Sequence, residues 1–187
     1  LWKLEFSEVF QEKWGFDIVI GNPPYVQLQK FARTQIQKDL ENAGYSTFTK
    51  NGDLYCLFYE RGLEMTRKDT GVLCYITSNK WMRAWYGEKL REYFVKHNPL
   101  KLLDLGSNVF SSATVDSNIL VIQNVGNKWK TLACVISDHS RSLDLQMKKA
   151  TLTHFMTTAS WFIWSSAEID LKTKIEKKWT PLREWNI

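Results

Sequence analysis

The stretch that most constrains this chain is residues 14–25, where an apolar run ends in two prolines. Residues 16–20 are apolar and rich in β-branched side chains, and Gly21 stops the run, which predicts a buried strand ending at a functional loop. That loop consists of Asn22, Pro23, Pro24 and Tyr25. Because proline fixes φ, lacks an N–H and pushes the preceding residue to extended backbone, the loop is stiff and rich in acceptors.

A stiff loop of acceptors suits a planar amino group, whose two N–H bonds need partners. The side-chain oxygen of Asn22 and the backbone carbonyl of Pro23 can accept one N–H bond each. Two acceptors held out of the amine plane favour the pyramidal nitrogen that forms in a transition state. Tyr25 then offers a flat face for stacking, and an ordinary proline-rich turn is the alternative interpretation.

Residues 17–25 closely resemble motif IV of the S-adenosylmethionine-dependent adenine-N6 DNA methyltransferases. The likeness is greatest to bacterial type II restriction-modification polypeptides, which join methyltransferase, target-recognition and sometimes endonuclease parts in one chain. This resemblance implies site-specific methylation of a flipped adenine in double-stranded DNA, with Asn22 to Tyr25 as catalytic residues. Glutamine and some RNA methyltransferases share the tetrapeptide, so these substrates remain alternatives.

The resemblance extends to other segments. Asp53, Leu54 and Tyr55 resemble motif V, which implies contact with the cofactor S-adenosylmethionine, as it also does for Asn22. Phe110 resembles the aromatic residue of motif VIII and would form a base-stacking slot with Tyr25, although a buried loop phenylalanine is the alternative. The family's main glycine-rich cofactor motif would lie upstream of residue 1, so we expect the fragment to be inactive alone.

Periodicity supplies the expected elements. Strands are predicted at residues 16–20, 71–77, 100–105 and 118–123, with the last pair antiparallel. Helices are predicted at residues 30–42, from an Asp53 N-cap to about residue 67, and from Ser78 or Asn79 to about residue 97. Together with the resemblance, residues 1–125 imply the C-terminal half of a three-layer, Rossmann-like α/β methyltransferase sheet.

The strand at residues 16–20 would then lack its neighbour in the sheet. We expect this edge to self-associate or to be covered by residues 1–13, which have near-helical apolar spacing. Among the aromatic residues that follow the second strand, Trp81 and Trp85 fit either core packing or nucleic-acid stacking, and packing is the preferred interpretation.

Residues 126–187 differ in character and are predicted to be a basic connector leading toward a target-recognition domain. A strand is expected at residues 131–137 and a helix at about residues 168–179. Of the net charge of +5, most lies in this tail, which has 10 basic against 6 acidic residues. Its densest basic cluster is a candidate DNA contact or a solvated helix face, and comprises Lys172, Lys174, Lys177 and Lys178.

Composition narrows the remaining possibilities. The 187 residues are 44% hydrophobic, which is enough for a core, and no apolar run reaches membrane-spanning length. Three scattered cysteines and three scattered histidines suggest neither a disulfide framework nor a metal site. We therefore expect a cytoplasmic protein without a metal, and we keep a non-catalytic DNA-binding module and a purely structural fragment as rival hypotheses.

Overall fold

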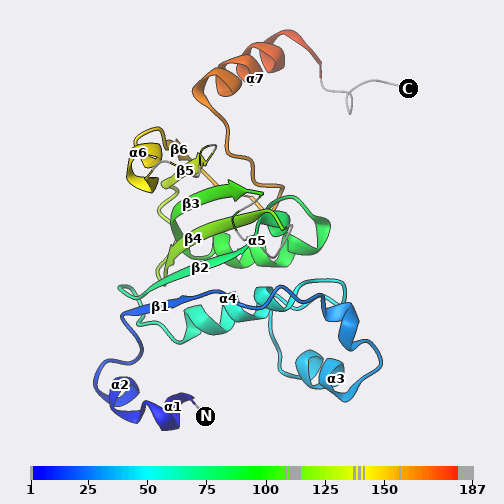
Figure 1. The fold of residues 1–187 in the computed structure, drawn as a ribbon, viewed down its shortest axis with the longest axis vertical. Helices are drawn as coiled ribbons and strands as arrows, with labels where there is room; N and C mark the ends of the chain where they lie inside the picture. Colours follow the sequence, from blue (N-terminus) through cyan, green and yellow to red (C-terminus); the bar gives the residue numbers. More distant parts are fainter. Residues whose placement is uncertain are drawn as a thin grey trace.

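The structure is a computed structural model that describes residues 2–107, 109, 115–136, 138, 140, 142–155 and 157–180. Within these residues, six strands form one mixed sheet in the order β1-β2-β4-β3-β5-β6 (Figure 1). The strands are β1 (Ile18–Gly21), β2 (Val72–Ser78), β3 (Asn98–Gly106), β4 (Ser117–Gln123), β5 (Thr131–Val135) and β6 (Thr151–Thr153). The α-helices are α1 (Trp2–Glu5), α2 (Ser7–Glu12), α3 (Gln35–Asn42), α4 (Leu54–Glu64), α5 (Glu88–Val95), α6 (Leu143–Met147) and α7 (Ser166–Lys178).

The pairing of the strands confirms the predicted α/β class. β1 runs parallel to β2, and α4 connects them, as expected for a right-handed crossover unit. β4 lies between β2 and β3 and is antiparallel to both, so the predicted antiparallel pair is confirmed. β5 runs parallel to β3 and β6 pairs antiparallel with β5, so the tail adds two strands to the same sheet.

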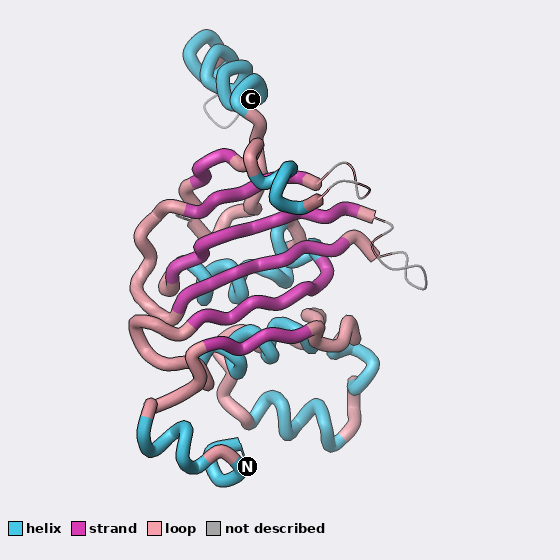
Figure 2. Tube along the Cα trace, turned by 60° about the vertical axis from the view of Figure 1, so that its left-hand side comes forward, coloured by secondary structure: helices cyan, strands magenta, loops and turns pink. Residues whose placement is uncertain are grey.

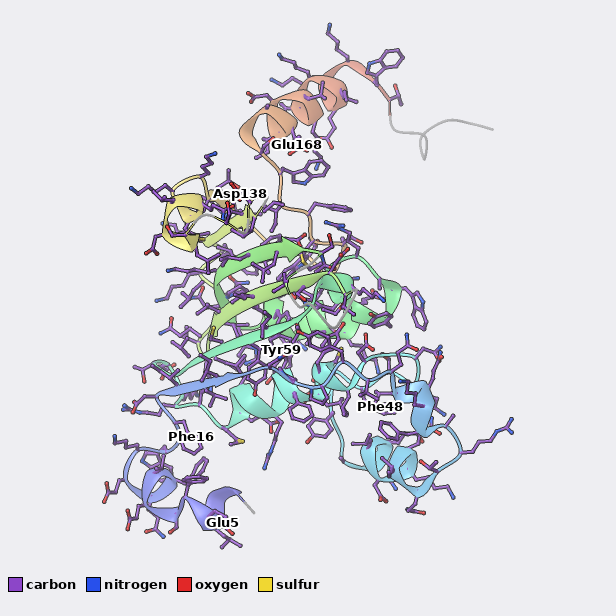
Figure 3. All side chains as sticks on the ribbon, viewed as in Figure 1. Glu5, Phe16, Phe48, Tyr59, Asp138 and Glu168 are labelled. Carbon is purple, nitrogen blue, oxygen red and sulfur yellow. The ribbon has the colours of Figure 1, made fainter. Side chains whose placement is uncertain are left out.

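One face of the sheet carries the main core. Helices α4 and α5 cover this face, as Figure 2 shows behind the strands. Tyr59 of α4 lies between the helix and β2 (Figure 3), with its ring 5.3 Å from that of Tyr75. A Cβ at Gly62 would clash with the Tyr75 hydroxyl, so this glycine lets α4 approach the sheet closely.

The other face of the sheet is covered only in part. A smaller cluster of Leu103, Leu105, Cys134 and Ile136 packs with Met147 at the end of α6. At β1 the prediction of a buried strand is wrong, because Ile18 and Ile20 are 68% and 78% exposed. The N-terminal segment leaves them exposed, although its Phe6 and Phe10 rings pack against Phe16, with ring centroids 5.3 and 5.4 Å away.

The helix predicted at about residues 79–97 is interrupted. Ser78 caps a 3-10 turn at Asn79–Met82, a second turn follows at Trp85–Gly87, and only then does α5 begin. A Cβ at Gly87 would collide with the backbone of Trp81, so the chain folds back tightly here. The preference for packing holds for Trp81, which is fully buried, but is wrong for Trp85, which is 67% exposed.

The tail divides into a packed part and a projecting part. Trp161 is buried against Phe155 and Trp81, with ring centroids 4.3 and 5.4 Å away. The helix expected near residues 168–179 is confirmed as α7, and it projects away from the sheet at the end opposite α3 (Figure 1). Whether residue 125 separates two domains stays a prediction. Among the described residues, no helix is long and apolar enough to cross a membrane.

Candidate functional site

The Asn-Pro-Pro-Tyr loop leaves the carboxyl end of β1, at the edge of the sheet. Pro23 is buried, whereas Asn22 and Pro24 are exposed. Among the described residues, neither the Asn22 side chain nor the Pro23 carbonyl has a hydrogen-bond partner. The loop therefore holds two free acceptors next to each other on a backbone that proline makes rigid.

Tyr25 anchors the loop to the body of the protein. Its ring meets the ring of Tyr55 edge to face, with centroids 6.2 Å apart and an interplanar angle of 82°. The Tyr25 hydroxyl is buried near Ser117 without a hydrogen bond of ordinary geometry, and burial raises the pKa of this phenol. Because part of the ring packs against the core, only the remaining part of its surface is open to a ligand.

The second wall predicted for a base slot is Phe110, which lies outside the described residues. The slot formed by Tyr25 and Phe110 therefore stays a prediction. The nearest described residue, Val109, packs against the smaller core cluster beneath α6.

The start of α4 lies beside the exit of the loop. The Leu54 N–H donates to the Val26 carbonyl and the Leu28 N–H donates to the Gly52 carbonyl, both at 2.8 Å. Leu28 is 2% exposed and fixes this pairing in the core. Two segments that lie 24 to 28 residues apart in the sequence are thus joined by backbone hydrogen bonds shortly after the loop.

The motif V residues differ in what they can offer a cofactor. Asp53 takes the N-cap position of α4, but its side chain does not cap the helix, so that part of the prediction is wrong. Its Oδ2 atom instead accepts a hydrogen bond of 2.8 Å from the Tyr86 hydroxyl. Tyr55 has no exposed surface, whereas Leu54 is partly exposed.

S-adenosylmethionine has a positively charged sulfonium and polar groups at both ends, so it needs contacts from several sides. Among the described residues beside the loop, Asn22 is exposed and Leu54 is partly exposed, whereas Asp53 is buried and already accepts a hydrogen bond from Tyr86. By themselves these residues do not fit this cofactor.

A buried row of polar side chains crosses the carboxyl end of β2, and the sequence analysis missed it. The Trp81 indole N–H and the Thr77 hydroxyl both lie 3.1 Å from Asn118 Oδ1, and the Tyr59 hydroxyl lies 3.0 Å from Thr77 Oγ1. Since an indole nitrogen only donates, Asn118 Oδ1 must be the acceptor. The signal that could have revealed this row is polar residues at inward positions of two apolar strands.

A second polar group lies at the end of β3. Asp104 is buried, and its carboxylate accepts hydrogen bonds from Asn79 Nδ2 at 2.8 Å and from the Gly106 N–H at 3.2 Å. Arg83 adds an ion pair at 3.5 Å. This group fixes the turn after β2 to the end of β3. It lies at the carboxyl ends of the strands, as the Asn-Pro-Pro-Tyr loop does.

The basic residues predicted to contact DNA lie far from the Asn-Pro-Pro-Tyr loop. They sit on α7, every described side chain of which is exposed, and Figures 1 and 2 both place α7 at the end of the molecule opposite α3. Lys172 pairs with Glu176 at 3.7 Å and lies 5.9 Å from the centroid of the Trp164 ring. DNA binding by Lys172, Lys174, Lys177 and Lys178 stays a prediction.

Known proteins share the sequence around this loop. The Eco57I restriction-modification methylase family model matches residues 1–110. Among curated relatives, the type II restriction enzyme and methyltransferase RM.Eco57I of Escherichia coli is 32% identical over 112 residues, covering 58% of this chain and 11% of that protein. The type II methyltransferase M.BstVI of Geobacillus stearothermophilus is 30% identical over 103 residues, covering 55% of this chain and 17% of that protein.

Solved structures resemble the chain in fold. The methyltransferase subunit of a type I restriction-modification system from Streptococcus thermophilus gives a TM-score of 0.55 at 16% identity, over 82% of this chain and 37% of that one. A putative class I S-adenosylmethionine-dependent methyltransferase from Listeria monocytogenes gives 0.52 at 17% identity, over 66% and 38%. The chain thus has the methyltransferase fold, spans only a small part of the curated relatives' length, and belongs to the Eco57I restriction-modification methylase family.

Proposed function

We propose that this chain forms the amine-binding half of a DNA adenine-N6 methyltransferase within a longer restriction-modification polypeptide. The observation that carries the proposal is the pair of free acceptors, Asn22 Oδ1 and the Pro23 carbonyl, on a rigid loop at the carboxyl end of β1. Family membership supports the reaction class, because the curated relatives are type II restriction-modification methyltransferases.

The acceptors act on the amino group of adenine. The lone pair of this nitrogen is delocalised into the ring, which makes it a poor nucleophile. Asn22 Oδ1 and the Pro23 carbonyl each accept one N–H bond and hold the amine so that it becomes more pyramidal, which returns the lone pair to nitrogen. Positive charge develops at the nitrogen during methyl transfer, and two fixed dipoles stabilise that charge more than they stabilise the planar amine.

The proposed methyl donor is S-adenosylmethionine, which supplies an electrophilic methyl group on a sulfonium. Asn22 and Asp53 are proposed as contacts to one side of this donor. The Asn22 amide is not basic at neutral pH, so it orients the amine, and the proton that the methylated nitrogen loses passes to water.

Tyr25 is proposed as one wall of the slot for the extruded base, with Phe110 as the other. The anchored ring of Tyr25 is suited to this role, because its contact with Tyr55 fixes its orientation before a base arrives. Stacking against such a ring contributes on the order of 1–3 kcal/mol per base.

The test uses the complete polypeptide that contains these residues, with radiolabelled S-adenosylmethionine and a duplex DNA substrate. We expect Asn22→Ala to lower kcat by about 10²–10³ while DNA affinity changes little, because the contact that it removes strengthens only in the transition state. Gln11→Ala is the matched control, since Gln11 is also an exposed amide but lies on α2, and it should retain the wild-type kcat.

Two results contradict the proposal. If the kcat of Asn22→Ala for adenine methylation lies within a few-fold of the wild-type value, Asn22 does not have the proposed role. If the polypeptide methylates single-stranded RNA or a glutamine-containing protein in preference to duplex DNA, the proposed substrate is wrong. The substrate is then that of another methyltransferase class that shares the tetrapeptide.

A further inference from the structure

A polar arm, defined here as residues 29–45, extends from the body directly after the Asn-Pro-Pro-Tyr loop. It contains a 3-10 turn that begins at Leu28 and the helix α3, which Thr34 caps through a hydrogen bond from the Gln37 N–H. None of the side chains of α3 is buried. Figure 1 shows the arm beyond the carboxyl end of β1, on the side toward which the loop points. An insertion placed next to a catalytic loop without a core of its own is typical of a binding element.

The arm is held firmly where it leaves the body. Leu28 is buried and pairs through its N–H with the Gly52 carbonyl. Beside it, the Gln29 side chain donates to Asn51 Oδ1 at 2.9 Å. The first residue of the arm is therefore fixed a few residues after Tyr25.

The arm is held more firmly where it returns. Glu60, a buried residue of α4, accepts four hydrogen bonds from the backbone and hydroxyl groups of Ser46 and Thr47, at 2.8–3.0 Å. A buried carboxylate that binds only neutral donors of one segment clamps that segment to the helix. Both ends of the arm are thus rigid with respect to the proposed amine site, although its surface is solvated.

The charges of the arm are arranged so that the cations remain available. Its two acidic residues are engaged locally, since Asp39 accepts from Gln35 at 2.8 Å and Glu41 pairs with Lys50 at 3.3 Å. Its three basic residues are all exposed and have no ion-pair partner within the described part of the chain, and they are Lys30, Arg33 and Lys38.

Arg33 is also held in an unusual backbone conformation. Its φ is +64°, in the left-handed region that non-glycine residues rarely adopt, and its N–H donates to Gln37 Oε1 at 3.0 Å. Such a conformation is strained and persists where the surrounding contacts fix it. The side-chain contact from α3 fixes the start of the Arg33 side chain in space.

From these observations we propose that the arm binds the phosphate backbone of duplex DNA beside the extruded base, with Lys30, Arg33 and Lys38 as the phosphate ligands. This inference rests on the proposed function for the location of the base, and it adds a second contact surface to the same site. Cations on a rigid support fix the register of a duplex through its phosphates without reading its sequence.

The test measures DNA binding by the 187-residue chain and needs no methyl transfer. Fluorescence anisotropy with a short duplex, whose central adenine lies opposite an abasic site, gives the affinity as a function of salt concentration. In the triple variant Lys30→Gln, Arg33→Gln, Lys38→Gln we expect the slope of log K against log salt to become shallower by about 2 to 3. Phosphate-ethylation interference compares the wild-type chain with the triple variant. We expect ethylation of the phosphates that flank the central adenine to weaken DNA binding by the wild-type chain but not by the variant.

The matched control neutralises three other exposed lysines, Lys68, Lys128 and Lys130. They precede β2 and β5 and therefore lie near the amino ends of these strands, away from the loop, and they have no ion-pair partner among the residues that the structure describes. This control should leave the interference pattern beside the adenine intact. Circular dichroism of both triple variants checks that the fold is retained.

Four outcomes overturn the inference. They are no DNA binding by the wild-type chain, an unchanged salt slope in the arm variant, an interference difference that does not flank the adenine, and tighter binding of an RNA duplex. A failure of the proposed function gives a different result. In that case Asn22→Ala still methylates adenine, while the salt dependence of DNA binding by the arm variant is still shallower than that of wild type.

Discussion

The outer strand β1 and the inner strand β2 look alike in sequence but differ in their surroundings. Both are largely apolar, yet β2 has strands on both sides and buries Leu73 completely, whereas Ile20 of β1 is 78% exposed. This difference shows that an apolar run indicates only that a strand is suited to burial. Whether its side chains are buried depends on the neighbouring strands and helices.

The same contrast holds for polar groups. Around β2, Thr77 and Asn118 are fully buried and joined by hydrogen bonds that also engage Trp81. Beside β1, Asp17 is half exposed and its partners, Lys13 and Arg67, are surface residues. The interior therefore stabilises the fold, and the outer edge leaves surface available for contacts.

The largest expected effect compares two tryptophans. Trp81→Ala should lower the free energy of unfolding by about 3–5 kcal/mol, because it empties a core position and leaves Asn118 Oδ1 with one donor fewer. Trp85→Ala should change it by less than about 0.5 kcal/mol, because that ring lies at the surface. Urea unfolding of both variants measures the difference, and equal losses would contradict the assignment of Trp81 to the core.

A smaller effect is expected at the outer edge. Ile20→Lys should leave the free energy of unfolding within about 0.5 kcal/mol of wild type, because the side chain is already exposed. We expect the wild-type chain to self-associate at high concentration through the unpaired edge of β1 and its apolar side chains, and the lysine to prevent this. Sedimentation velocity over a concentration series is the measurement, and a wild-type chain that stays monomeric throughout would show that the exposed edge does not associate.

The smallest effect concerns acid. The Arg67 guanidinium, 2.6 Å from Asp17, holds the pKa of this carboxyl below its usual range, and Lys13 adds to the effect. A folded-state pKa below the unfolded one means that the pair stabilises the protein above pH of about 4 and that this contribution is lost as the pH falls further. Unfolding of wild type and Asp17→Asn should therefore differ at neutral pH and converge in acid, and a constant difference across this range would contradict the pairing.

Much of the fold could be predicted from local signals. The strands near residues 71–77, 100–105 and 118–123 and the helix near residues 168–179 are predictable because their apolar runs and capping residues are local properties of the chain. The helix predicted after Ser78 is wrong in extent, because the tight return at Gly87 depends on contact with Trp81. The capping role of Asp53 is wrong for a similar reason, since Tyr86 competes for its carboxylate.

The stiffness of the loop after β1 could be predicted from the sequence, because the order of residues from Asn22 to Tyr25 gives a rigid loop of acceptors whatever surrounds it. Contacts between segments distant in the chain anchor Tyr25 on Tyr55 while Asn22 stays without a partner among the described residues, and they bind the arm to Glu60. The strand order places β1 as the outermost strand of the sheet. Loop stiffness follows from the covalent geometry of proline, so the local sequence is enough to predict it. Burial, hydrogen-bond partners and strand neighbours are set by residues distant in the chain, which no local pattern records.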